Sequence, residues 1–347
     1  MPEPRLRAAI IGCGRIGAGQ LGVRRRHRQS PSKPAVDSHA AVLCRSPRVQ
    51  VIALADNDPL RLRAARSRWR VQRGYADYRR LLAEVPLDLL SICTPNPTHA
   101  EVLLAAIHAG VKTIWMEKPL ASSSREARRI LAAAERAQTR ILLNYSRRFS
   151  RTYADLRQRL QRGLIGPIVA VEGHYMRGLA NNGSHLLDLC RFLFGEIAAV
   201  RGVDSLHETE PDASLDAFLL TCSGIPIYLR ALPRHYDFFE LRIFGERGQV
   251  DLVQRGAEPH LYRRIPSREC VTGYDLRPRP WRGPRGLADA WPRALANLLA
   301  VHRRSAPPLC SAWDGWQALR LVEMIRRSAQ NRSRSLPLTS AEAACRH

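Results

Sequence analysis

The stretch LRAAIIGCGRIG, residues 6–17, decides the fold. Its first half is an apolar run that predicts a short buried strand, and three glycines follow it at once. Gly12 allows a tight turn, Gly14 lets the backbone approach a pyrophosphate, and Gly17 permits close helix–strand packing. The spacing predicts a dinucleotide-binding turn, and a glycine-rich turn without a ligand is the alternative. The expected cofactor-binding residues of this turn are Gly12, Gly14, Arg15, Ile16 and Gly17.

Apolar runs and helical patterns alternate after this turn. Strands are expected at residues 49–55, 87–94 and 111–116, with helices between them. This alternation predicts a parallel sheet built from right-handed crossovers. We therefore expect a doubly wound Rossmann domain over residues 1–122.

The pattern changes in the remaining residues, 123–347. Successive strand candidates follow one another with few helices between them, which predicts a mostly antiparallel open sheet in a second α/β domain. Two amphipathic helices are expected at 287–303 and 313–328, whereas 255–284 shows no clear period. The strand candidates are residues 168–175, 198–203, 215–222, 227–232, 238–244 and 249–253.

Asp56 ends the second expected strand, where an acid would accept hydrogen bonds from the adenosine ribose hydroxyls. Thirty-nine positions separate it from Gly17, against a usual gap of about 20. The arginine-rich stretch 18–34 accounts for the extra length and is expected to form an exposed loop.

The same carboxylate would repel the 2′-phosphate of NADP, so NAD is the expected cofactor and NADP the alternative. No arginine follows Asp56 immediately. Arg15, Arg24 or Arg61 would favour NADP if one of them reached the ribose.

The charge of the chain is strongly basic. Lys and Arg number 55 against 31 Asp and Glu, a formal charge of +24, yet only three of these residues are lysine. The arginines are spread along the whole chain and aromatic residues make up 6%, so we expect no nucleic-acid partner.

No apolar stretch approaches about 18 residues, so no membrane span is expected. Eight cysteines without C-x-x-C or zinc-ligand spacing predict no metal site and favour the cytoplasm.

The sequence Glu117-Lys118-Pro119 stands at the end of an expected parallel strand. Ligands bind at this edge of an open α/β sheet. A lysine there, desolvated so that its pKa falls, would exchange a proton with a substrate. An exposed lysine in a turn is the alternative.

Residues 181–188, NNGSHLLD, open the helix that begins the second domain. His185 and Asp188 are spaced i and i+3, on one face of that helix. An imidazole beside a nicotinamide would be an acid–base group near neutral pH. The alternatives are a packing role for His185 and, for Asp188, fixing a neighbouring side chain.

Taken together, these motifs resemble the Gfo/Idh/MocA oxidoreductase family. The resemblance implies a Rossmann domain followed by an α/β domain whose open sheet forms a homo-oligomer interface, giving a dimer or tetramer. It also implies hydride transfer between a nicotinamide and a hydroxyl-bearing carbon of a sugar, inositol or nucleotide sugar. The motifs that carry it are residues 12–17, the turn TPNPTH at 94–99, Glu117-Lys118-Pro119, and Gly183-Ser184-His185 with Asp188.

The resemblance also implies roles for single residues. Lys118 and His185 would be the acid–base and substrate-orienting groups, and Glu117 would contact the cofactor ribose. The residues that would border the nicotinamide are Thr94, Pro95, Asn96 and His99.

One position departs from the family pattern. Many members carry an aspartate four residues before the histidine, where this chain has Asn181. An amide exchanges no proton, so Asn181 would hydrogen-bond a substrate hydroxyl while Lys118 carries the proton.

Several side chains near the expected cleft are candidates for substrate binding. Arginines would bind a carboxylate or diphosphate through bidentate contacts, or they would merely follow the basic composition. The candidates are Tyr145, Arg147, Arg148, Tyr175, Arg177 and Asp188.

The resemblance leaves two other readings open. One is a cofactor-binding regulator on the same fold, which Asn181 and the basic composition favour. The other is an enzyme whose substrate is not a sugar, such as a tetrapyrrole or a dihydrodiol.

Overall fold

The computed structural model describes residues 4–19, 38–233 and 238–338. They form two compact units, the first built from the chain up to Phe149 together with Ala288–Trp316, the second from Ser150–Leu287 and the chain after Trp316. The division lies elsewhere than the expected boundary at 122/123. The reason is that β6 (Arg140–Leu143) pairs in parallel with β5 (Thr113–Met116), so residues 123–149 extend the first sheet.

The first unit contains a six-stranded parallel sheet of order β3-β2-β1-β4-β5-β6. The chain moves outward from β1 in one direction and from β4 in the other, so the strand order reverses between these two strands. Ligands bind at the carboxyl ends of the strands at such a switch point. The remaining strands are β1 (Leu6–Ile11), β2 (Val49–Ala55), β3 (Arg73–Tyr75) and β4 (Leu89–Ile92).

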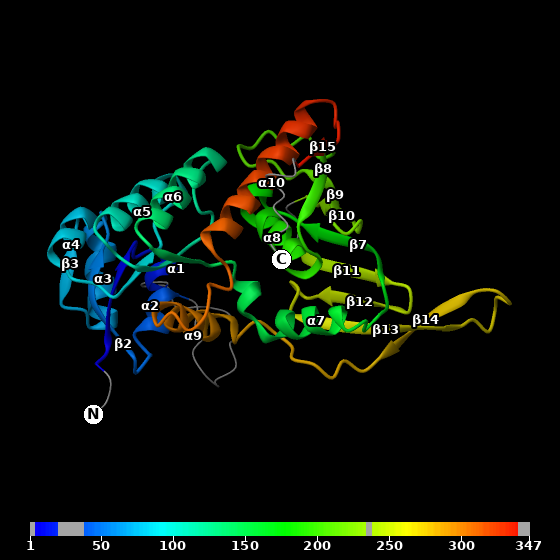
Figure 1. Cartoon of the computed structure of the whole chain (residues 1–347), viewed down its shortest axis with the longest axis horizontal. Helices are drawn as coiled ribbons and strands as arrows, with labels where there is room; N and C mark the ends of the chain where they lie inside the picture. Colours follow the sequence, from blue (N-terminus) through cyan, green and yellow to red (C-terminus); the bar gives the residue numbers. More distant parts are fainter. Residues whose placement is uncertain (1–3, 20–37, 234–237, 339–347) are drawn as a thin grey trace. The chain divides into compact units, whose positions relative to one another are not determined.

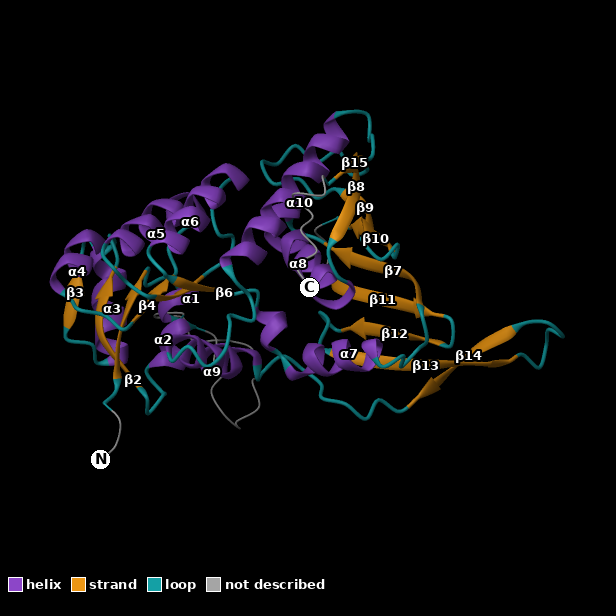
Figure 2. Ribbon diagram, in the orientation of Figure 1, coloured by secondary structure: helices purple, strands orange, loops and turns teal. Residues whose placement is uncertain are grey.

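Helices cover both faces of this sheet (Figure 2). Helices α5 and α6 pack together, whereas α9 packs with α2 and contacts β5 and β6. Positions 20–34 of the expected exposed loop lie outside the described residues. The helical elements of the first unit are α1 (Arg15–Ala18), α2 (His39–Leu43), α3 (Pro59–Trp69), α4 (Tyr78–Glu84), η1 (Asn96–Thr98), α5 (His99–His108), α6 (Ser124–Arg136), η2 (Ser146–Phe149) and α9 (Ala290–His302).

The second unit contains a nine-stranded sheet of order β14-β13-β12-β11-β7-β10-β9-β8-β15 (Figure 1). Among the described strands of this sheet only β7 and β10 pair in parallel, so the sheet is mostly antiparallel, as predicted. The strands are β7 (Ile168–Tyr175), β8 (Ile197–Val203), β9 (Asp216–Thr221), β10 (Pro226–Ala231), β11 (Phe239–Gly245), β12 (Gly248–Val253), β13 (Glu258–Pro266), β14 (Tyr274–Arg279) and β15 (Leu336–Pro337).

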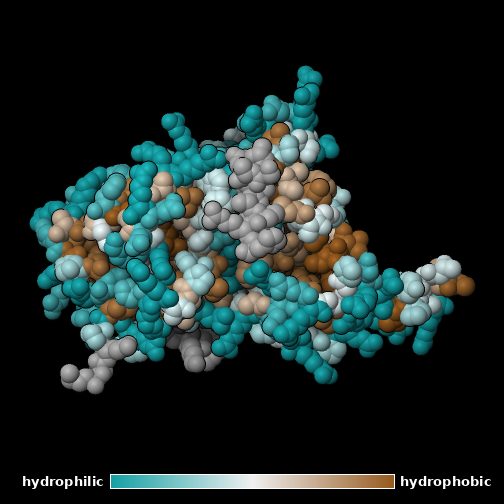
Figure 3. Space-filling view, in the orientation of Figure 1, coloured by the Kyte–Doolittle hydropathy of each residue, from teal (hydrophilic) through white to brown (hydrophobic). Residues whose placement is uncertain are grey.

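The hairpin of β13 and β14 occupies the region for which the sequence predicted nothing. Much of β13 and nearly all of β14 is exposed or half-buried, so no alternation of apolar and polar residues marks the two strands. Hydrophobic colour is visible at the tip of this hairpin in Figure 3, where Val271 is fully exposed.

One face of the nine-stranded sheet packs on helices and forms the core of the second unit. Alternate residues such as Val171 and Tyr175 of β7 point into that core. The other helical elements are α7 (Arg151–Gln161), η3 (Gly178–Gly183), α8 (Ser184–Phe194) and α10 (Ala312–Gln330), which runs across the division between the units. No described helix combines the length and apolar character needed to cross a membrane.

Candidate functional site

The glycine turn lines a pocket of about 630 Å³ in the first unit, at the carboxyl ends of β1, β2 and β4. A Cβ on Gly12, which has φ +94°, would lie 2.5 Å from the backbone of Cys93, and one on Gly17 would lie 1.8 Å from the carbonyl oxygen of Gly12. A Cβ on Gly14 would meet no atom within 4 Å. Gly12 and Gly17 therefore serve close packing, whereas Gly14 leaves open space against the backbone, as a pyrophosphate requires.

Asp56 lies at the end of β2 and lines the same pocket. Its side chain is buried, with Oδ2 accepting a hydrogen bond of 2.7 Å from the Cys13 amide and Oδ1 one of 2.8 Å from the Asp58 amide. Two backbone donors thus hold the carboxylate against the glycine turn. Each oxygen keeps a lone pair that a ribose hydroxyl can approach.

Thr94 follows β4 and lines the pocket beside Pro95. Its hydroxyl oxygen is buried and has no hydrogen-bond partner among the described residues. A buried hydroxyl without a partner is costly, and a bound ligand would satisfy it. Gly14, Asp56 and Thr94 together fit a bound dinucleotide.

His99 is not among the residues that line the pocket, and its expected place beside the nicotinamide stays a prediction. The side chain is fully buried, with Nδ1 2.6 Å from the carbonyl oxygen of Pro119 and Nε2 2.8 Å from that of Thr94. Both ring nitrogens are therefore occupied by backbone. The ring ties the turn after β4 to the turn after β5.

Glu117 lies at the end of β5 and is held by two side chains. Nε2 of His39 lies 3.1 Å from its Oε1, and Nδ2 of Asn144 donates to the same oxygen at 2.5 Å. Burial by itself would raise the pKa of Glu117. The hydrogen bonds and charge of His39, the Asn144 amide and the neighbouring Lys118 outweigh burial and hold the pKa below its usual range.

Lys118 stands between two anchored residues. Glu117 is fixed through its side chain, and the carbonyl of Pro119, which follows a cis peptide bond, is fixed by His99. The backbone of the lysine is thereby held on both sides at the carboxyl edge of the sheet.

In the second unit, Asn181 lies in η3, a π-helix that continues directly into α8. The Ser184 hydroxyl donates a hydrogen bond of 3.0 Å to the Asn181 carbonyl, and His185 is the next residue. The chain enters this segment through two residues of positive φ, a strained +67° at Arg177 and +88° at Gly178, which glycine adopts without strain. π-helices recur at functional sites.

Two profiles of one family match the chain. The first, described as an oxidoreductase family with an NAD-binding Rossmann fold, matches residues 6–145, and the second, its C-terminal alpha/beta domain, matches residues 157–338. The chain belongs to this Gfo/Idh/MocA oxidoreductase family. It is an NAD-dependent oxidoreductase.

Curated relatives agree with this assignment. An inositol 2-dehydrogenase of Acidothermus cellulolyticus is 29% identical over 331 residues, 89% of each chain. A D-apiose dehydrogenase of Paraburkholderia graminis is 26% identical over 370 residues, covering 98% of this chain and 91% of the relative.

A solved structure shares the fold at low identity. The WlbA dehydrogenase of Bordetella pertussis, determined in complex with NADH and UDP-GlcNAcA, superposes with a TM-score of 0.75 at 19% identity. The match covers 98% of this chain and 99% of that one.

Two of the oxidoreductase's expected substrate-binding residues have structural partners. The Tyr175 hydroxyl donates to the Leu215 carbonyl at 2.6 Å and accepts from the Leu215 amide at 3.0 Å, and the ring lies in the core of the second unit. The alternation along β7 puts it on the buried face. We therefore correct Tyr175 to a core residue.

Arg148 likewise makes its contacts with residues of the first unit. Its buried guanidinium lies 3.1 Å from Asp314 and donates to the Leu309 carbonyl at 3.4 Å. These contacts hold η2 against the first turn of α10 and the residues just before it, so Arg148 is corrected to a structural role. Among the other candidates, Tyr145 and Asp188 are buried, and Arg147 and Arg177 are half-buried or exposed.

Sequence reasoning missed His39, the partner of Glu117. Its imidazole is fully buried, lies 2.7 Å from the Ser91 hydroxyl, and has its ring centroid 4.0 Å from that of Trp115, with the two rings tilted by 44°. The one local signal in the sequence was Ser38, a typical helix-capping residue. Its side chain accepts a hydrogen bond from the Ala41 amide and caps the helix that begins at His39.

Proposed function

We propose that this oxidoreductase transfers a hydride between NAD and a hydroxyl-bearing carbon of a polyhydroxylated substrate, an inositol, a sugar or a nucleotide sugar. The relatives named inositol 2-dehydrogenase and D-apiose dehydrogenase support this substrate class. The observation that carries the proposal is Lys118, held between Glu117 and Pro119 at the sheet edge that the NAD pocket shares.

In the oxidative direction Lys118 takes the hydroxyl proton, and a nicotinamide held in the pocket would supply the hydride acceptor. A lysine does so in its neutral form. His185 orients the substrate hydroxyl and shares the acid–base work, and Asn181 hydrogen-bonds a second hydroxyl.

For the cofactor, Asp56 accepts the adenosine ribose hydroxyls and the backbone at Gly14 receives the pyrophosphate. Thr94, Pro95 and Asn96 border the nicotinamide end. Arg147 and Arg177 remain the candidates for an anionic substrate group.

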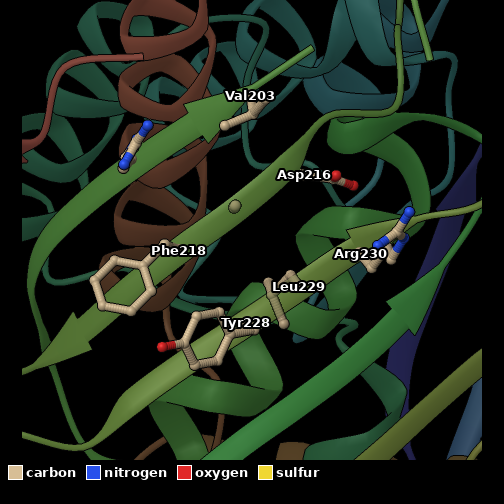
Figure 4. A pocket seen from close by; sticks show the side chains of 8 residues that line it. Val203, Asp216, Phe218, Tyr228, Leu229 and Arg230 are labelled. Carbon is tan, nitrogen blue, oxygen red and sulfur yellow. The ribbon is translucent and has the colours of Figure 1, made fainter. Parts of the chain in front are cut away.

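We also propose a homo-oligomer that buries the outward face of the nine-stranded sheet. A hollow of about 460 Å³ lies on this face (Figure 4). The rings of Phe218 and Tyr228 lie 5.1 Å apart there, and Tyr228 is 51% exposed. Exposed aromatic side chains favour a protein interface.

The spacing of the cysteines supports a location in the cytoplasm.

The test compares two lysines of the same unit. Wild type is first screened with NAD⁺ and myo-inositol, apiose, uronic acids and UDP-sugars, with absorbance of NADH as the readout. Lys118→Met is expected to abolish turnover while the Kd for NADH stays unchanged. Lys112→Met is the matched control, because the exposed Lys112 ammonium donates to the Ala137 carbonyl and does not line the NAD pocket. Turnover by Lys118→Met would refute the role of this lysine.

A further inference from the structure

The helix that carries Asn181 starts without a cap of its own. Its first residues are those of η3, and the preceding Arg177 makes no side-chain capping bond. The first amides of a helix have no partner inside it, so they must find acceptors elsewhere. Here they find them on a distant part of the chain.

The acceptors all belong to the tripeptide Asp212-Ala213-Ser214, which lies between β8 and β9. This tripeptide satisfies four consecutive amides. The bonds run from Gly178 N to Ser214 Oγ at 3.0 Å, Leu179 N to Ala213 O at 3.2 Å, Ala180 N to Asp212 Oδ1 at 2.8 Å, and Asn181 N to Asp212 Oδ2 at 3.0 Å.

Asp212 contributes most to this cap. A carboxylate at a helix start interacts favourably with the helix dipole and makes charge-assisted hydrogen bonds. Nη2 of Arg326 on α10 lies 2.7 Å from Oδ1 and holds the carboxylate from its other side. A Cβ on Gly178 would lie 2.1 Å from Oδ2, so this approach requires glycine at that position.

We infer that Asp212 is a positioning residue of the oxidoreductase. It fixes the amide of Asn181 directly. It fixes His185 through the same turn, because Ser184 donates to the Asn181 carbonyl. The inference rests on the proposed roles of Asn181 and His185, and all of its contacts lie within the second unit.

Loss of the carboxylate frees two amides and lets the turn move. A displacement of about 1 Å in a positioning element costs on the order of a hundredfold in rate. NAD binding should not change, because the pocket residues lie in the first unit.

The experiment compares Asp212→Ala and Asp212→Asn with Asp204→Asn. Asp204 lies in the same connection but accepts only the His207 amide of its own turn among the bonds found for it. Hydrogen exchange followed by mass spectrometry reports on residues 177–183 without any substrate. Turnover is measured with NAD⁺ and the screened compound that wild type oxidises fastest, per NADH-binding site.

For Asp212→Ala we expect at least tenfold faster exchange in residues 177–183 and a kcat lowered tenfold to a hundredfold, with the Kd for NADH within twofold. Asp212→Asn keeps one acceptor oxygen, so its exchange rate and its kcat should lie between those of wild type and Asp212→Ala. If Asp212→Ala does not fold, Asp212→Asn provides the test. Counting NADH-binding sites separates a positioning loss from a loss of folded protein.

An unchanged exchange rate of residues 177–183 in the Asp212 variants would show that Asp212 does not cap this segment. Faster exchange with an unchanged kcat would show that the cap does not position Asn181 and His185 for turnover. Failure of the proposed function gives a different result. In that case Lys118→Met, Asn181→Ala and His185→Ala would keep turnover, whatever the exchange data show.

Discussion

His39 and Glu117 form a pair in which Nε2 of the fully buried imidazole lies 3.1 Å from Oε1 of the half-buried carboxylate. The two residues come from different elements, α2 and the end of β5, and the pair adjoins Lys118. The donors that face this carboxylate favour its charged form and outweigh the effect of desolvation on its pKa. The pair therefore supports both the fold of the first unit and the charge beside the proposed proton acceptor.

We expect His39→Phe to lower the free energy of unfolding by about 2 kcal/mol, because Glu117 loses a charge-assisted bond and keeps its burial. Urea denaturation at pH 7 measures this change. His108→Phe, at the exposed end of α5, is the matched control and should change stability little. Equal stability of the two variants would show that His39 contributes only packing.

The lowered pKa of Glu117 makes a pH-dependent contribution to stability. Because the folded pKa lies below the ordinary value of 4.5, the contribution is complete above that value and is lost as the pH falls through the folded pKa. Glu117→Gln should therefore be less stable than wild type at pH 7, with a difference that shrinks toward pH 3. Urea unfolding across this range measures the difference, and a gap that does not change with pH would contradict the assignment.

Asp56 should set the preference for NAD over NADP. We expect Asp56→Ser to raise the Kd for NADH about tenfold to a hundredfold through lost charge-assisted bonds, and to lower that for NADPH, since Arg61 lines the same pocket. Fluorescence titration with both cofactors measures the ratio. Asp88→Asn, which precedes β4 at the opposite end of the strands, is the control. An unchanged NADH:NADPH ratio would rule out this role.

The sequence was sufficient for the parts of the site that follow from local spacing. The glycine turn, Asp56 and the Glu117-Lys118-Pro119 turn each stand directly after an apolar run, so the end of a predicted strand locates them. Even the error at Tyr175 had a local signal. The alternation along β7 puts this residue on the same face as Val171, in the core.

Contacts between distant positions were not predictable in this way. His39 reaches Glu117 across 78 positions and Asp212 reaches Asn181 across 31. Neither contact leaves a period or a spacing in the sequence, because each depends on how loops are closed by tertiary packing. The hairpin of β13 and β14 was missed for another reason, since it buries too little apolar surface to leave an alternating pattern.

The glycines of the turn offer a contrast between folding and binding. Gly17→Ala should lower stability by about 1–3 kcal/mol, because its Cβ would collide with the Gly12 carbonyl. Gly14→Ala should leave the melting temperature unchanged, since Gly14 has φ −69° and its Cβ would meet no protein atom. That Cβ would instead stand where the pyrophosphate approaches, so the Kd for NADH should rise about tenfold or more. Thermal unfolding without cofactor and NADH titration separate the two effects. Wild-type affinity in Gly14→Ala would mean that the dinucleotide does not cross this turn.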